Sequence, residues 1–141
     1  MMECKINWLP EAGMAFMAQT GTGHILNMDG APEAGGNNLA PRPMELLLAG
    51  AGGCTAFDVV LILQRSRQSV SACEVSVQAE RAESDPKVFT KMNLHFLVKG
   101  SNLDSSKVER AISLSHDKYC SATAMLGKTA EITYSFEVVQ S

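Results

Sequence analysis

The fold of this chain is decided by one nearly uncharged stretch, which reads Pro43-Met44-Glu45-Leu46-Leu47-Leu48-Ala49-Gly50-Ala51-Gly52-Gly53-Cys54-Thr55-Ala56-Phe57-Asp58. Proline is well tolerated in the first turn of a helix, and an acidic residue such as Glu45 is favourable there. Arg65 and Arg67 suit the opposite end of the same helix dipole. We therefore expect one helix from Pro43 to about Gln68. Apolar residues cover almost its whole circumference, which predicts a helix surrounded by protein on nearly every side.

The apolar part of this segment, residues 46–63, is long enough to raise the question of a membrane span. Thr55 and Asp58 are its only polar interruptions. A carboxylate near the middle of a span is costly in hydrocarbon, and the flanks show no charge asymmetry that would orient one. We therefore expect a buried helix and no membrane association.

Length and composition favour one globular domain over residues 1–141. The 12 basic residues are scattered among 15 acidic ones, so the chain lacks the basic patch of a nucleic-acid or anionic-lipid binder, and a small neutral or organic ligand is favoured. Four widely spaced cysteines without a secretory signal indicate a reducing cytoplasm rather than a disulfide scaffold.

Alternating apolar and polar residues predict strands over residues 4–8, 14–19, 24–28, 73–81, 89–99 and 132–139. The first three would form a meander, and the two that follow the long helix would form a second, longer hairpin. Residues 29–41 are rich in glycine, asparagine and proline, so we expect a loop of a length that is often functional.

A second helix is predicted with Asp104 or Ser105 as its N-cap. It is amphipathic, and its buried face would contain Val108, Ala111, Ile112 and Ser115. After a break near Tyr119, Ser121 would cap a short helical turn that ends at Gly127.

A central helix that is apolar on all sides needs more covering surface than one chain of this size supplies. A second copy of the chain would provide the missing wall, so we expect a homodimer. Gly50, Gly52 and Gly53 would let two such helices approach closely. Glycine otherwise weakens a helix by roughly 1 kcal/mol relative to alanine, which favours a packing reason for the three.

Cys54 and Cys120 are the candidates for chemistry. Taken alone, Cys54 is most simply a packed core thiol, and Asp58, four residues later, lies on the same helix face. Cys120 directly precedes the short helix, so its thiol would face the free N–H groups of the first turn. Cys4 and Cys73 occupy inward positions of alternating segments, and we interpret both as core residues.

The histidines predict no metal site. His24, His95 and His116 are isolated, and no pair of cysteines or histidines has the short spacing of a common metal-binding motif. The chain also lacks a dinucleotide fingerprint, a phosphate-binding loop and a serine-hydrolase elbow. We therefore expect neither a metal nor an organic cofactor.

The segment from Pro43 to Cys54, followed by Lys118-Tyr119-Cys120-Ser121, resembles the OsmC/Ohr family of osmotically inducible and organic hydroperoxide resistance proteins. The order of the expected elements agrees with this family over essentially the whole chain. The resemblance implies an α+β fold in which antiparallel sheets enclose a long buried central helix. It also implies an intertwined homodimer with active sites at the interface between its subunits.

Members of this family are thiol peroxidases, so the resemblance implies a cytoplasmic oxidoreductase that protects against oxidative stress. Cys54 matches the peroxidatic cysteine, which reduces a small organic hydroperoxide, and Cys120 matches the resolving cysteine that condenses with it. Glu45 and Arg42 would orient or support the site across the dimer. The chemistry needs no metal or flavin, and a dithiol reductant, a lipoylated protein in the best-known branch, would restore the thiols.

Two differences keep alternatives open. The peroxidase branch has glutamate directly after its proline, whereas Met44 follows Pro43 here and Glu45 comes one place later, a rotation of about 100° on a helix. That branch also has an arginine in its first third, and no arginine precedes Arg42. One alternative is a binder of a small hydrophobic or thiol-reactive ligand in the same apolar pocket, with slow or no turnover. Another is a stable dimer in which the cysteines only pack.

Overall fold

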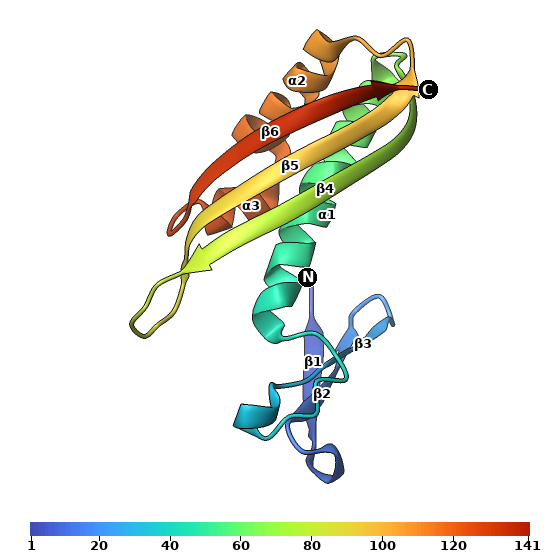
Figure 1. The fold of residues 1–141 in the computed structure, drawn as a ribbon. Coiled ribbons are helices and arrows are strands. Elements are labelled where there is room, and N and C mark those ends of the chain that lie inside the picture. The colour runs from blue at the N-terminus through green and yellow to red at the C-terminus, as the bar shows by residue number, and fades with distance from the viewer. The chain divides into compact units, whose positions relative to one another are not determined.

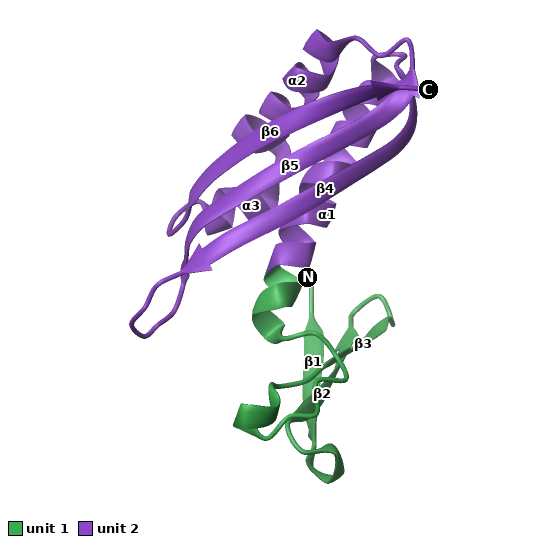
Figure 2. Cartoon of the chain, viewed as in Figure 1, with its two compact units in different colours: residues 1–47 green, residues 48–141 purple.

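The computed structural model describes residues 1–141 (Figure 1). The chain forms two compact units, residues 1–47 and residues 48–141 (Figure 2). Helix α1, Pro43–Arg65, contributes residues to both. Two three-stranded sheets and several helices confirm the α+β class, while one domain over residues 1–141 stays a prediction.

The first unit contains an antiparallel meander, as its alternating segments predicted. Its strands are β1 (Cys4–Leu9), β2 (Ala15–Thr20) and β3 (Ile25–Met28), in the order β1-β2-β3. All six residues of the edge strand β1 are exposed, including Trp8, which is 54% exposed. The interpretation of Cys4 as a core residue was therefore wrong for the single chain, because nothing covers this strand.

A buried carboxylate organises the predicted loop over residues 29–41. Asp29 is 4% exposed and accepts hydrogen bonds from the backbone N–H groups of Leu39 (3.1 Å), Gly30 (2.7 Å) and Asn37 (3.2 Å). These bonds hold the pKa of Asp29 below its ordinary value, and the bond from Leu39 has the largest effect. The loop, which includes the 3₁₀ turn Pro32–Ala34, is thus fixed by one side chain that the sequence did not single out.

Helix α1 begins as predicted and ends slightly earlier. Its first turn is closed by the N–H of Arg42, which donates to the Glu45 carboxylate at 2.9 Å, an arrangement that occurs in capping boxes. The helix ends at Arg65, and Arg67 then adopts a left-handed conformation with φ of 61°. By length and composition alone α1 could cross a membrane, and no other helix here could.

Only one side of α1 is covered in the single chain, and the expectation that a second copy covers the rest stays a prediction. The buried residues recur at helical spacing and are Ala51, Gly52, Thr55, Val59 and Leu63. On the open side, Phe57 is 69% exposed. A Cβ atom on Gly50 or Gly53 would meet nothing within 4 Å, whereas one on Gly52 would lie 3.1 Å from Val77. Gly52 therefore permits close packing on the sheet of the second unit.

The second unit is a three-stranded sheet with helices on one side (Figure 1). Strands β4 (Ser69–Arg81) and β5 (Phe89–Ser101) form the predicted hairpin. Strand β6 (Glu131–Gln140) pairs in parallel with β5, so the expectation of purely antiparallel sheets was wrong for this sheet. A parallel neighbour requires a crossover, and α2 (Ser105–Leu114) and α3 (Ser121–Leu126) lie within it.

The core of this unit lies between β5, α1 and α2. Alternate residues of β5, among them Leu94, Phe96 and Val98, are at most 3% exposed and belong to one cluster with Val59, Leu63, Val108, Ala111 and Ile112. The predicted buried face of α2 is confirmed, including Ser115, which is fully buried. Asp104 is its N-cap and accepts from the N–H of Ser106 at 2.9 Å.

Candidate functional site

Three potential ligand or reacting groups meet in the second unit. The sulfur atoms of Cys54 and Cys120 and a carboxylate oxygen of Asp58 all lie within 4.8 Å of one another. Cys54 and Asp58 are one helical turn apart on α1, as their spacing predicted. Cys120 comes from the crossover between α2 and α3, 66 residues further along the chain than Cys54. The structure thus brings the two candidate cysteines together.

A π-helical turn, Ser115–Tyr119, places Cys120. The N–H of Cys120 donates to the carbonyl oxygen of Ser115, five residues back, at 2.8 Å. Such wide turns are rare and are often found at functional sites. Cys120 then leaves the helical conformation, with φ of −74° and ψ of 106°. The turn ends α2 and turns the Cys120 side chain towards α1.

Cys120 itself caps α3. Its sulfur accepts a hydrogen bond from the N–H of Thr123 at 3.4 Å, so the prediction that this thiol faces free N–H groups is confirmed. The sequence suggested Ser121 as the N-cap. The N-cap is instead Cys120, because Ser121 is already the first residue of the helix. The Cys120 sulfur thereby accepts from a backbone N–H in the first turn of α3, where other helices often use a side-chain hydroxyl as the acceptor.

A buried hydroxyl fixes the carboxylate of the cluster. The Ser115 hydroxyl donates to Asp58 Oδ2 at 2.9 Å and contacts the Thr55 hydroxyl at 2.8 Å. Because the one proton of Ser115 is directed at Asp58, Thr55 is the donor in the second bond. Thr55 and Ser115 are 3% and 0% exposed. The sequence placed Ser115 on a buried face without indicating that it serves the site.

Burial raises the pKa of the Cys120 thiol above its ordinary value. The hydrogen bonds from Thr123 lower it, while hydrogen bonding and charge at Cys54 raise it again. Cys73, which is half-buried in β4, also has a raised pKa because of burial.

The two other predicted site residues lie in the first unit. Glu45 caps α1 through the N–H of Arg42, and the Arg42 guanidinium donates to the carbonyl oxygen of Ala40 at 3.4 Å. These contacts give both residues a role at the beginning of α1. Their participation in chemistry at Cys54 stays a prediction.

An apolar hollow of about 360 Å³ lies on the exposed side of α1 within the second unit. It is open to solvent and is lined by Gly53, Ala56, Phe57, Val60, Leu61, Gln64 and Cys73. Its first residue directly precedes Cys54. Cys54 itself does not line the hollow, because successive residues of a helix point about 100° apart.

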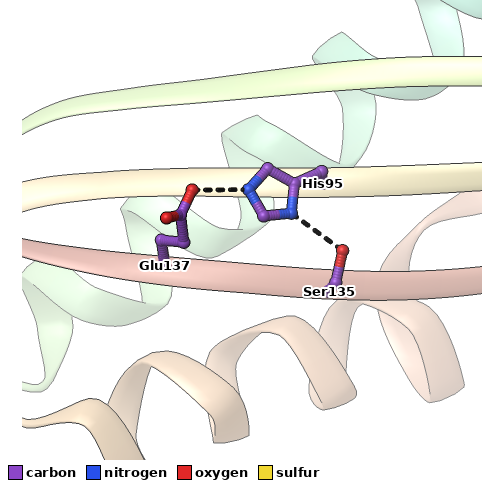
Figure 3. Close-up of polar contacts among 3 residues, drawn as sticks. All are labelled: His95, Ser135 and Glu137. Atoms are coloured by element: carbon purple, nitrogen blue, oxygen red, sulfur yellow. Dashed lines mark hydrogen bonds and ion pairs between the residues drawn. The ribbon is translucent and has the colours of Figure 1, made fainter.

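A second polar cluster lies on the open face of the β5 and β6 strands (Figure 3). His95 contacts Ser135 through Nδ1 at 2.8 Å and Glu137 through Nε2 at 2.9 Å. A serine, histidine and acid also form hydrolase triads, but there the serine contacts Nε2 and the acid contacts Nδ1. His95 and Glu137 are 35% and 66% exposed, and the three residues are cross-strand neighbours. We interpret them as a surface polar ladder.

The comparisons identify the family. The sequence profile described as OsmC-like protein matches residues 35–135, so the chain belongs to the OsmC-like family. Protein YhfA of Escherichia coli strain K12 is 46% identical over 138 residues, which cover 98% of each chain.

Solved structures agree with this family fold. A hypothetical protein from Aquifex aeolicus VF5 is 28% identical, with a TM-score of 0.85 over 100% of this chain and 98% of that one. The fold is also shared by an organic hydroperoxide resistance protein OsmC from Legionella pneumophila. That protein is 15% identical, with a TM-score of 0.70 over 97% of this chain and 96% of its own.

Proposed function

We propose that this protein reduces organic hydroperoxides in the cytoplasm with the Cys54 and Cys120 thiols, and that a dithiol reductant restores them. The observation that carries the proposal is the meeting of the two sulfur atoms, within 4.8 Å, in a member of the OsmC-like family. Residues so far apart in sequence have no reason to meet through local structure. Their proximity suits a pair that forms and breaks a disulfide.

The exposure of the two thiols supports an order of reaction in which Cys54 reacts first. Cys54 is partly exposed, whereas Cys120 is 2% exposed and has a pKa that burial raises. The Cys54 thiolate would attack the terminal oxygen of the hydroperoxide and break its O–O bond. Cys54 becomes a sulfenic acid, and the leaving alkoxide takes a proton to give the alcohol.

The second step joins the two sulfurs. Cys120 attacks the Cys54 sulfenic acid, and one water leaves as the disulfide forms. A dithiol then reduces this disulfide by thiol–disulfide exchange and is itself oxidised to a cyclic disulfide. The cycle thus consumes one hydroperoxide and one dithiol and yields one alcohol, one water and one oxidised dithiol.

The proposal includes a homodimer. The open face of α1, with Phe57 exposed and no atoms near the Cβ positions of Gly50 and Gly53, suits close packing of a second copy. The exposed strand β1 presents further apolar surface, including Ile6 and Trp8. In such a dimer, Arg42 and Glu45 of one subunit would support the thiol site of the other.

A second function is favoured by a specific observation. The hollow on the exposed side of α1 is apolar and open, and Met44 rather than a glutamate follows Pro43. A protein that binds a small hydrophobic or thiol-reactive compound would need this surface but no efficient turnover. It would retain a ligand at Cys54 without forming the Cys54–Cys120 disulfide.

Peptide mapping after brief exposure to peroxide tests the proposal. We expect substoichiometric cumene hydroperoxide to give a Cys54–Cys120 disulfide faster than hydrogen peroxide does. Cys120→Ser should stop at a Cys54 sulfenic acid that dimedone traps, and Cys54→Ser should abolish peroxide consumption. Cys73→Ser is the matched control and should react like the unaltered protein. Unmodified thiols in the unaltered protein would favour the binding function instead.

A further inference from the structure

The cluster of Cys54, Asp58 and Cys120 has the composition of a metal site as well as of a redox pair. Two sulfur atoms and a carboxylate oxygen lie within 4.8 Å of one another. A tetrahedral zinc ion with Zn–S bonds of about 2.3 Å holds its ligand atoms about 3.8 Å apart. The three groups therefore need to close by only about 1 Å to share one ion.

We propose that the reduced site binds a thiophilic divalent cation such as Zn²⁺ through Cys54, Asp58 and Cys120. Cys54 and Asp58 supply two ligands from one turn of α1, the spacing by which helices commonly present paired ligands. Cys120 supplies the third from the crossover. This proposal goes beyond peroxide reduction, and it does not require that the thiols react with peroxide.

The chemistry of the ligands selects the class of metal. Thiolate sulfur favours zinc and other soft or borderline ions over Mg²⁺ and Ca²⁺, which prefer oxygen. Two thiolates and one carboxylate carry three negative charges, and the ion carries two positive charges. Three protein ligands leave the fourth tetrahedral position to water or to an external ligand.

The surroundings are built to hold two of these ligands in place. The Ser115 hydroxyl bonds one oxygen of Asp58 and leaves the other free for an ion, and Thr55 fixes Ser115 in turn. The N–H of Thr123 donates to the Cys120 sulfur. Hydrogen bonds of this kind orient metal ligands and stabilise their charged forms.

Metal binding and peroxide reduction would compete at this site. A thiolate that coordinates zinc is a weaker nucleophile because it shares one lone pair with the ion, and a disulfide cannot bind the ion in this way. Binding displaces protons from the thiols, because zinc takes cysteine as the thiolate. The inference therefore predicts that protons are released as the metal binds.

The test uses the full chain, reduced and free of metal. We expect one Co²⁺ to bind with release of thiol protons and with the near-ultraviolet charge-transfer band of a thiolate complex, and Zn²⁺ to displace it without further proton release. Cys54→Ser and Cys120→Ser should lose this band. Cys4→Ser and Cys73→Ser, which remove the two other cysteines, should keep it.

Asp58→Asn separates this proposal from the proposed function, because it leaves both thiols in place. We expect its affinity for Zn²⁺, measured against a chromophoric chelator, to fall by at least about tenfold. The Cys54–Cys120 disulfide should still form with cumene hydroperoxide in this variant. Equal zinc affinity in Asp58→Asn, or a charge-transfer band that survives Cys54→Ser, would overturn the metal site. A wild-type protein that binds zinc as described but ignores peroxide would overturn only the proposed function.

Discussion

The hydroxyl of Ser115 donates a 2.9 Å hydrogen bond to the carboxylate of Asp58, and this bond joins the π-helical turn to the middle of α1. It connects residues 57 positions apart, and the donor is fully buried. The same turn positions Cys120, since the N–H of Cys120 donates to the carbonyl oxygen of Ser115. Ser115 therefore couples the two elements that carry the two thiols.

Replacing Ser115 with alanine should lower the free energy of unfolding by about 1–3 kcal/mol, because it leaves the Thr55 hydroxyl buried without its partner. Urea denaturation followed by circular dichroism measures this change. The double variant Ser115→Ala with Thr55→Val removes both partners, so its loss should be smaller than the sum of the two single losses. Strict additivity would contradict the coupling that the contact distance of 2.8 Å implies.

The raised pKa of Cys120 predicts how stability depends on pH. A thiol whose pKa is raised by burial favours the folded state in its protonated form. The contribution of Cys120 to stability is fully present below the pKa that this thiol has in the unfolded chain. It is lost as the pH rises through the higher pKa that the thiol has in the folded protein. Stability should therefore decline in the alkaline range, and Cys120→Ser should flatten this decline. Thermal unfolding at a series of pH values measures it, and a decline that is identical in Cys120→Ser would exclude this thiol as a cause.

Glu45 allows a structural role to be separated from a chemical one. Glu45→Ala removes the acceptor for the N–H of Arg42 and should cost about 0.5–2 kcal/mol of stability. Glu45→Gln keeps an acceptor oxygen and removes the charge, so its stability should be nearly unchanged. If the Glu45 charge supports the thiol site in a dimer, the Glu45→Gln variant should consume organic hydroperoxide more slowly than the unaltered protein, although its stability is unchanged. An unaltered rate would restrict Glu45 to capping the helix.

The sequence predicted the elements whose pattern is local. Strand alternation located β1 to β6, and Asp104 was one of the two residues predicted as the N-cap of α2, because periodicity and capping depend on neighbouring residues. The pairing of Cys54 with Cys120 came from the family resemblance, since nothing local to either residue indicates the other.

Features set by distant contacts were missed. The π turn at Ser115–Tyr119 has no periodic signature, so Ser121 was taken for the cap in place of Cys120. The parallel pairing of β6 with β5 depends on the path of the crossover and not on either strand alone. The apolar residues around α1 led us to expect a second copy as part of its cover, and the single chain covers only one side of the helix, so that expectation stays a prediction.

Phe57 tests that last point. It is 69% exposed on the open face of α1, so a second copy packed there would bury a large aromatic side chain. Phe57→Glu should weaken association by about 2 kcal/mol or more, a roughly 30-fold increase in the dissociation constant. Sedimentation or light scattering over a range of concentrations measures it. Val139→Glu, which adds the same charge at a 40% exposed apolar position on β6, is the matched control and should leave association unchanged. A protein that is monomeric without any substitution, or a Phe57→Glu variant that associates normally, would show that this face of α1 is not the dimer interface.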